Sequence, residues 1–281
     1  MDKKILIPTD FSKNALNAIR YGLDLYAKIK CEFYFLNVFH LDNYTTGTLI
    51  MPEPGSAEYE TAKRASEEEL AKLLNMLKLR HNNPKHSYHT ISSFNFLSEA
   101  MKQTIANKDI DLVMMGTQGA TGAKGIIFGS NTVNAMEYIR ECPVMAIPDG
   151  LQFTIPKEIV FPTNYKSAFS GMELNYLIEI AKMHNTSIRI LHFTKKTVLD
   201  EEQETHKQLL DDIFKNVDHS FHTLTDKNIA QGITAFVESR NSNMIAFINK
   251  KHFLFHSIFS KPLVKEIGYD ATVPILALNE P

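Results

Sequence analysis

The sequence has little of what marks secreted or membrane-inserted proteins. It has two cysteines, Cys31 and Cys142, in 281 residues, too few for a disulfide framework, so we expect a reducing compartment. No segment approaches the ~18 consecutive apolar residues that a membrane-spanning helix needs. The opening stretch MDKKILIPTD has a very short apolar run before a proline, which is unlike a signal peptide. A cytoplasmic location is the expectation.

The chain also has no excess of one charge. Lysine and arginine number 30 against 32 acidic residues, for a net charge of −2. This balance provides no global field to attract nucleic acid or an acidic lipid surface, and we expect neither as a partner. The hydrophobic content of 44% can fill a sizeable core, and the length suggests about two domains at roughly 100–200 residues each.

The sequence repeats itself over a long period. Residues 3–39 (KKILIPTDFSKNALNAIRYGLDLYAKIKCEFYFLNVF) align without a gap with residues 157–193 (KEIVFPTNYKSAFSGMELNYLIEIAKMHNTSIRILHF). The ends of the halves also correspond: 111–115 matches 243–247, and 143–148 matches 274–279. So long a period indicates two similar domains rather than a solenoid. We predict domains at residues 1–150 and 151–281, with the boundary near 149–155.

Strands and helices alternate within each half. In the first half we predict strands near 3–8, 32–39, 86–91, 110–115 and 143–147, and helices near 13–29, 57–81, 95–107 and 130–140. Continuous apolar strands indicate a sheet that is covered on both faces. The alternation implies right-handed parallel crossovers. The predicted fold is therefore α/β, with two tandem doubly wound five-stranded parallel-sheet domains. Residues 41–56 read as a surface loop that is long enough to cover a site.

A glycine-rich stretch, MMGTQGATGAKGIIFGSNTVNAM (114–136), joins the predicted fourth strand to the next helix. In open α/β sheets, ligands bind at the carboxyl ends of the strands. If the first and fourth strands are neighbours, Pro8-Thr9-Asp10 and this glycine loop line one crevice. Glycine lets the backbone approach a ligand closely or adopt a positive φ.

The end of this loop suits an anion. Gly129 and Ser130 stand at the predicted helix start, where free N–H groups favour a phosphate, and Ser130 is a candidate N-cap. Composition alone is equally compatible with a merely flexible loop. A P-loop and a dinucleotide fingerprint are excluded, because the stretch has neither Gly-Lys nor Gly-x-Gly.

The spacing Gly116-x2-Gly119-x9-Gly129-Ser130 resembles the G-2x-G-9x-G-(S/T) nucleotide motif of the universal stress protein family. The Pro-Thr-Asp after the first strand and the proline-led strand that closes each half resemble that family too. The resemblance covers almost the whole chain as a tandem pair. It is weakest over residues 41–85 and after residue 195.

The resemblance implies an adenine-nucleotide site in the first half, holding ATP, AMP or ADP. Mg²⁺ would accompany the nucleotide, held mostly by phosphate oxygens and water. Pro8, Thr9 and Asp10 would lie on the adenosine side, Val38 would meet adenine through its backbone, Met115 and Gly116 would flank the ribose and first phosphate, and Gly119, Gly129, Ser130 and Asn131 would hold the phosphates. Structural alternatives stay open: Asp10 as a helix cap, and Val38 and Met115 as core residues.

The second half lacks the motif. The equivalent stretch FINKKHFLFHSIFSKPLVKEI (247–267) has no glycine: Ile248 and Lys251 replace the first two glycines, and Asp10 becomes Asn164. We infer that this half does not bind ATP in the family's manner and serves as a partner of the first. His252 and His256 have no further ligands at suitable spacing, so no metal site is predicted.

The resulting hypothesis is a nucleotide-responsive stress-adaptation protein that is not a fast enzyme and has no assigned catalytic residue. Two alternatives remain: an interaction scaffold that needs no nucleotide, and a slow ATP hydrolase. The resemblance also implies that the closing strands, 143–148 and 273–278, pair within one chain as an internal pseudo-dimer, because domains of that family commonly pair through their last strands. Unpaired edge strands are a liability, which favours the same pairing. Further association into a homodimer is left open.

Overall fold

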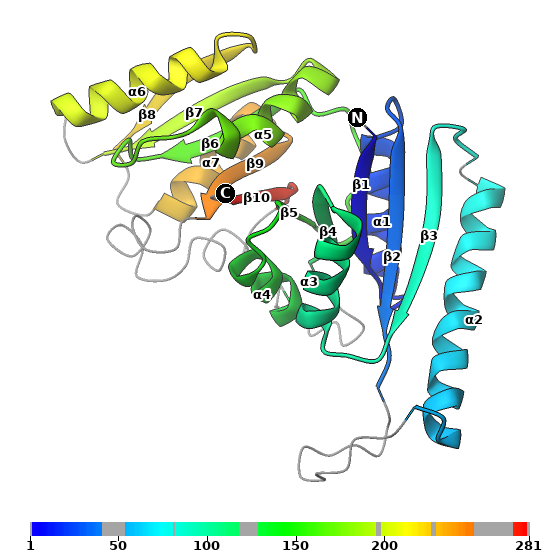
Figure 1. Cartoon of the computed structure of the whole chain (residues 1–281). Coiled ribbons are helices and arrows are strands. Elements are labelled where there is room, and N and C mark those ends of the chain that lie inside the picture. Colours follow the sequence, from blue (N-terminus) through cyan, green and yellow to red (C-terminus); the bar gives the residue numbers. More distant parts are fainter. Residues whose placement is uncertain are drawn as a thin grey trace.

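A computed structural model describes residues 2–40, 54–80, 82–117, 129–194, 198–225, 229–249 and 272–279. Its strands form one ten-stranded sheet in the order β3-β2-β1-β4-β5-β10-β9-β6-β7-β8 (Figure 1). The first half contains β1 (Lys3–Pro8), α1 (Lys13–Leu25), β2 (Cys31–Val38), α2 (Ala57–Arg80), β3 (His86–Ser93), α3 (Leu97–Lys108), β4 (Leu112–Gly116), α4 (Ser130–Tyr138) and β5 (Val144–Ile147). The second contains β6 (Glu158–Thr163), α5 (Gly171–His184), β7 (Ser187–Phe193), α6 (Glu201–Phe214), β8 (His219–Leu224), α7 (Ile229–Arg240), β9 (Met244–Asn249) and β10 (Ile275–Asn279).

The two halves have the same strand order. Within each half all neighbouring strands are parallel, and the first strand of the half lies between its second and fourth strands. The halves meet through β5 and β10, which pair antiparallel with Met145 opposite Leu276. The predicted α/β fold is confirmed, and so is the predicted pairing of the closing strands within one chain. The expected domain boundary falls between β5 and β6.

Burial explains the strand sequences. Every residue of β5, β6 and β10 is buried, whereas the edge strands β3 and β8 are only partly covered. The apolar runs therefore belong to strands with two neighbours and two covered faces. The edge strands also have similar six-residue sequences, a similarity that the sequence analysis missed. These are HSYHTI at 86–91 and HSFHTL at 219–224. This match is a further sign of the repeat.

The gapless alignment of the two halves needs one correction. Pro8 pairs with Leu36 in the first half, but its equivalent Pro162 pairs with Leu191, one residue later than a gapless alignment predicts. The structure therefore aligns His192 with Asn37 rather than with Val38. Both side chains contact a threonine carbonyl oxygen at the end of the first strand of their half. Asn37 Nδ2 lies 2.8 Å from the Thr9 oxygen, and His192 Nδ1 lies 3.3 Å from the Thr163 oxygen.

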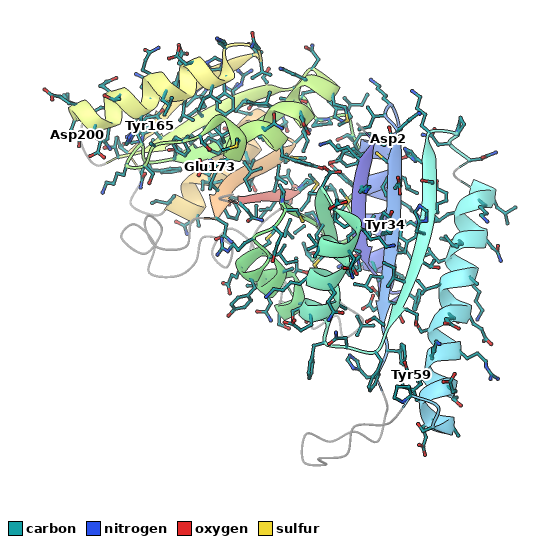
Figure 2. All side chains as sticks on the ribbon, in the orientation of Figure 1. Asp2, Tyr34, Tyr59, Tyr165, Glu173 and Asp200 are labelled. Atoms are coloured by element: carbon teal, nitrogen blue, oxygen red, sulfur yellow. The ribbon has the colours of Figure 1, made fainter. Side chains whose placement is uncertain are left out.

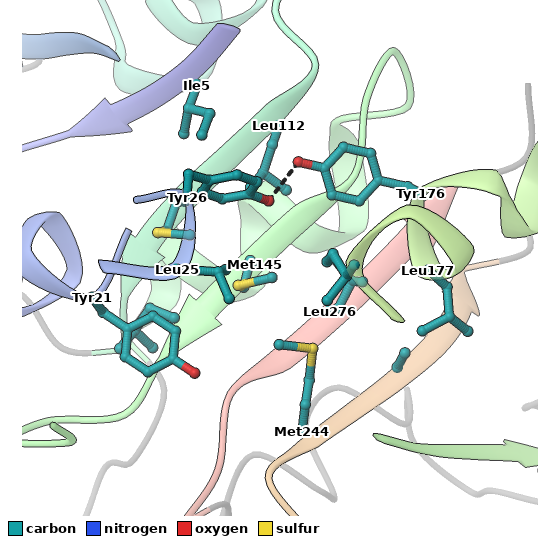
Figure 3. Close-up of a cluster of buried hydrophobic side chains, with 14 of the residues drawn as sticks. Ile5, Tyr21, Leu25, Tyr26, Leu112, Met145, Tyr176, Leu177, Met244 and Leu276 are labelled. Carbon is teal, nitrogen blue, oxygen red and sulfur yellow. Dashed lines mark hydrogen bonds between the residues drawn. The ribbon is translucent and has the colours of Figure 1, made fainter. Parts of the chain in front are cut away.

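Helices cover both faces of the sheet. One core packs α1, α2, α5 and α6 against it, and a second core lies on the face that carries α3, α4 and α7. On the first face α1 of one half contacts α5 of the other. There the buried Tyr26 and Tyr176 hydroxyls are 2.7 Å apart (Figure 3), and the His184 ring bonds the Leu25 carbonyl oxygen. Helix α1 ends at Leu25 and not near 29, because Tyr26 is its C-cap.

Candidate functional site

The segment after β1 forms a tight polar turn. The Phe11 N–H donates to Thr9 Oγ1 (3.0 Å), and the Ser12 N–H donates to the Asp10 carboxylate (3.1 Å). Phe11 has a φ of 60°, a left-handed conformation that a bulky residue rarely adopts. The two side-chain acceptors hold this turn, so that Asp10 lies exposed at the carboxyl edge of the sheet.

The second half builds the same turn. Thr163 Oγ1 accepts from the Tyr165 N–H (3.1 Å), Asn164 Oδ1 accepts from the Lys166 N–H (2.9 Å), and the φ of Tyr165 is 57°. An amide oxygen therefore serves this turn as well as a carboxylate does. The N-cap of α1 is Ser12, whose hydroxyl accepts from the Ala15 N–H, so the alternative of Asp10 as the helix cap is wrong.

Gly116, the last residue of β4, is a glycine for a packing reason. A Cβ there would lie 2.9 Å from the backbone oxygen and side chain of Asn14 on α1, closer than real contacts allow. Its φ is not in the left-handed region. Of the two reasons that the sequence suggested, close approach applies and positive φ does not. The close neighbour is this chain's own helix.

The two ends of the glycine loop meet at the sheet edge. The Gly129 N–H donates to the Thr117 carbonyl, and the Thr132 hydroxyl donates to the Gly116 carbonyl (2.8 Å). Gly129 is the N-cap of α4, with ordinary extended backbone, so the assignment of Ser130 as N-cap is wrong. Ser130 and Asn131 are exposed in the first turn, where helix N–H groups lack intrahelical partners and favour an anion. Gly119 lies outside the described residues.

Val38 and Met115 both pack in the second core, so the alternative reading of them as core residues holds for both. Val38 ends β2 and is half-buried, whereas Met115 is buried in the second core. Pro8 and Thr9 are buried at the end of β1. Because β1 pairs with both β2 and β4, the ends of these three strands lie side by side, at the point where the strand order reverses. The structure thus brings together all predicted site residues that it describes.

A buried polar network beneath this edge was missed by the sequence analysis. Asn37 donates to the Thr9 carbonyl and accepts from the Ser66 hydroxyl of α2 (2.7 Å), and Ser66 Oγ lies 2.7 Å from Ser92 Oγ of β3. The network fixes the start of the β1 turn relative to α2 and β3. The available signal was Asn37 itself, a polar residue near the end of the apolar run FYFLNV.

In the second half, aromatic rings pack near the corresponding edge. The His192 ring stacks on Tyr165 at 4.3 Å between centroids, and His206 Nδ1 lies 2.7 Å from the Tyr165 carbonyl oxygen. Burial lowers the pKa of His192, and the nearby Lys207 lowers it further. Lys251, Ser260 and Lys261 stand where the first half has Gly119, Gly129 and Ser130. These three residues and the pair His252 and His256 lie outside the described residues. Within the described ranges, no group of three or more His, Cys, Asp or Glu side chains is placed to hold a metal ion.

An open parallel sheet with helices on both faces and a helix N-terminus at its switch point defines the doubly wound α/β class. The family model of the universal stress protein family matches residues 1–148. The chain belongs to the universal stress protein family. It is 27% identical over 147 residues to a universal stress protein of Methanocaldococcus jannaschii, a match that covers 52% of this chain and 81% of that protein.

Solved structures share the fold over nearly the whole chain. A universal stress protein from Archaeoglobus fulgidus superposes with a TM-score of 0.70 at 16% identity, covering 98% of this chain and 96% of its own. A protein of unknown function from Pseudomonas aeruginosa PAO1 gives a TM-score of 0.61 at 9% identity, covering 99% and 92%. None of the helices within the described ranges has the length and apolarity needed to cross a bilayer.

Proposed function

We propose that the first half binds an adenine nucleotide, ATP or else AMP or ADP, at the carboxyl ends of β1, β2 and β4. Mg²⁺ would accompany the triphosphate, held by phosphate oxygens and water. The observation that carries the proposal is the junction of the two motif segments: the Asp10 turn and the N-terminus of α4 lie on neighbouring strand ends. The motif spacing and the membership of the family support the same site.

The residues present fit such a ligand. The first turn of α4 supplies N–H groups for phosphate oxygens, and its cap, Gly129, has no side chain to obstruct them. Asp10 supplies an exposed carboxylate as an acceptor for hydroxyl or amino hydrogens. The helix N–H groups bind negative charge that the phosphates already carry, and neither group is placed to act as a nucleophile or as a general base on a phosphate. The protein would therefore act as a nucleotide-responsive binding protein in stress adaptation and not as a fast enzyme.

The chain itself offers a matched variant for the test. Asp10→Asn keeps the turn, because Asn164 makes the same turn in the second half. It removes the negative charge from the site. We expect ATP binding, measured by calorimetry with Mg²⁺, to weaken several-fold, because a hydrogen bond to a neutral amide oxygen is roughly half as strong as one to a carboxylate. Gly129→Val should weaken it further by placing a side chain at the helix N-terminus. Asn164→Asp, the reverse change in the second half, is the control and should leave affinity unchanged.

The number of nucleotides bound per chain shows whether one half or both halves bind. We expect one nucleotide per chain, since the second half lacks the glycine motif and has Asn164 in place of Asp10. Binding of two nucleotides per chain would refute the proposal that the second half does not bind one. Saturable ATP binding that is indifferent to both Asp10→Asn and Gly129→Val would move the site elsewhere. No binding of ATP, ADP or AMP would refute the proposal and leave the nucleotide-independent scaffold.

A further inference from the structure

Three aromatic rings gather where the nucleotide's base is expected. Phe39, the residue after Val38, lies 5.6 Å from the Tyr59 ring and 5.5 Å from the Phe94 ring, centroid to centroid, and Tyr59 and Phe94 are 5.4 Å apart. We call Phe39, Tyr59 and Phe94 the aromatic triad. Its members come from the residue after β2, the first turn of α2 and the residue after β3. Figure 2 shows Tyr59 where α2 begins, beside the arrowheads of β2 and β3.

The local structure fixes the aromatic triad at this edge. The Ser56 hydroxyl accepts from the Tyr59 N–H (3.3 Å), and the Ser56 carbonyl accepts from the Glu60 N–H, which sets the start of α2. Two turns further along the same helix face, Ser66 is bonded to Asn37, which donates to the Thr9 carbonyl. A continuous set of contacts therefore holds Tyr59 in register with the β1 turn.

The aromatic triad retains exposed ring surface. Phe39 is 7% exposed, whereas Tyr59 and Phe94 are only half-buried. Strand ends in a sheet are spaced about 4.8 Å apart, so the ends of β4 and β2 are about 10 Å apart along the edge. A nucleotide whose phosphates lie at the N-terminus of α4 beside β4 would extend its base across β1 toward β2. Aromatic faces bind planar bases by stacking and apolar contact.

We infer that the aromatic triad is the base-binding wall of the site, with Tyr59 as a residue that determines affinity for the base. This inference rests on the proposed function. It makes the start of α2, which lies outside the glycine motif of residues 116–130, part of the nucleotide site. An aromatic wall favours ligands with a large planar base over ligands that offer phosphates alone.

The test compares Tyr59→Leu with Tyr59→Phe in the full chain, by ATP calorimetry with Mg²⁺. Leu keeps an apolar side chain and removes the ring, and Phe keeps the ring. We expect Tyr59→Leu to weaken ATP binding about 5- to 150-fold, the range for a lost base–aromatic contact. Tyr59→Phe should stay within about twofold of wild type. Tyr138→Leu, which removes a ring that is 61% exposed on α4, is the control and should bind as wild type.

The outcomes separate the inference from the proposed function. If wild type binds ATP and Tyr59→Leu binds equally well, the aromatic triad is not part of the site and the proposed function stands. Equal losses in the Leu and Phe variants would also overturn the inference. A wild-type chain that binds no ATP overturns both. Circular dichroism melting checks folding, and Phe94→Leu replaces Tyr59→Leu if that variant does not fold. Tripolyphosphate has no base. Its affinity, measured by competition with ATP, should therefore be equal for wild type and Tyr59→Leu.

Discussion

Replacing Glu158 by Gln should strongly destabilise the fold. Glu158 lies at the amino end of β6 with its side chain 11% exposed. Its carboxylate accepts from Arg189 Nε at 2.7 Å, from Arg240 Nε and Nη2 at 2.7 and 2.9 Å, and from Ser242 Oγ at 2.7 Å. Glutamine preserves the shape but removes the negative charge and converts one acceptor into a donor that faces the guanidinium groups.

The loss of unfolding free energy in Glu158→Gln depends on the charged groups that remain after the substitution. Two guanidinium groups would stay partly buried, and the other carboxylate that the structure describes beside Arg189 is that of Asp218, at 3.6 Å and 71% exposed. Removing one partner of a buried ion pair costs about 3–5 kcal/mol. The whole stability of a native protein is about 5–15 kcal/mol. We therefore expect the melting temperature to fall on the order of 10 °C.

Urea unfolding followed by circular dichroism measures this difference. The matched control is Glu204→Gln, which removes an exposed carboxylate 3.8 Å from Lys207 and should leave stability within experimental error. A loss below about 1 kcal/mol for Glu158→Gln would refute the argument. It would mean that the desolvation cost of this ion cluster cancels its attraction.

The same carboxylate predicts how stability depends on pH. Although burial opposes ionisation, the hydrogen bonds from Arg240, Arg189 and Ser242 lower the pKa of Glu158 from 4.5 to about 2. Because the folded pKa lies below the unfolded one, the contribution is fully present above about pH 4.5 and is lost as the pH falls toward 2. It amounts to about 3 kcal/mol. Acid titration of unfolding in wild type and Glu158→Gln checks this, and identical acid profiles would contradict it.

Three further predictions concern other parts of the fold. Gly116→Ala should cost about 1–3 kcal/mol in urea unfolding, because the new Cβ would lie 2.9 Å from Asn14; no loss would mean that α1 shifts freely. Tyr26→Phe or Tyr176→Phe should each cost about 1–3 kcal/mol by leaving one buried hydroxyl unpaired, and a double-mutant cycle should show the double variant losing less than the sum. His192→Asn introduces the residue that the first half has at the equivalent position, Asn37. In this variant, part of the loss of stability below about pH 6.5 should disappear. The reason is that burial lowers the pKa of His192, so protonation favours the unfolded chain; an unchanged pH profile would count against this.

Much of the fold could be predicted from the sequence. The first strand was placed correctly at 3–8 and the first helix start at 13, because an apolar run and a turn after it mark them locally, although the helix cap is Ser12 and not Asp10. The end of α1 was placed too late, since no glycine or proline follows it and its termination depends on a turn at Tyr26. The one-residue shift between β2 and β7 was also missed, because local sequence matches as well in either register.

The site was predicted in part. The Asp10 turn and the two ends of the glycine loop were identified by local residue types, whose geometry depends on near neighbours. The reason why position 116 requires glycine was not identified, since the residue that excludes a Cβ there is Asn14, far away in the chain. The contacts of Asn37 and Tyr59 were missed for the same reason: neither residue belongs to a motif, and their partners lie on other strands or helices.

The alternation of strands and helices, the repeat and the loss of the glycine motif in the second half follow from the amino-acid sequence alone, because periodicity, turn residues and spacing are local properties. The tertiary structure added the antiparallel register of β5 on β10, with Met145 opposite Leu276, and the neighbouring positions of β1 and β4. It also decided that the rings of Phe39, Tyr59 and Phe94 meet. These contacts join residues distant in the chain, and they arise when apolar strand faces and helix stripes are buried together.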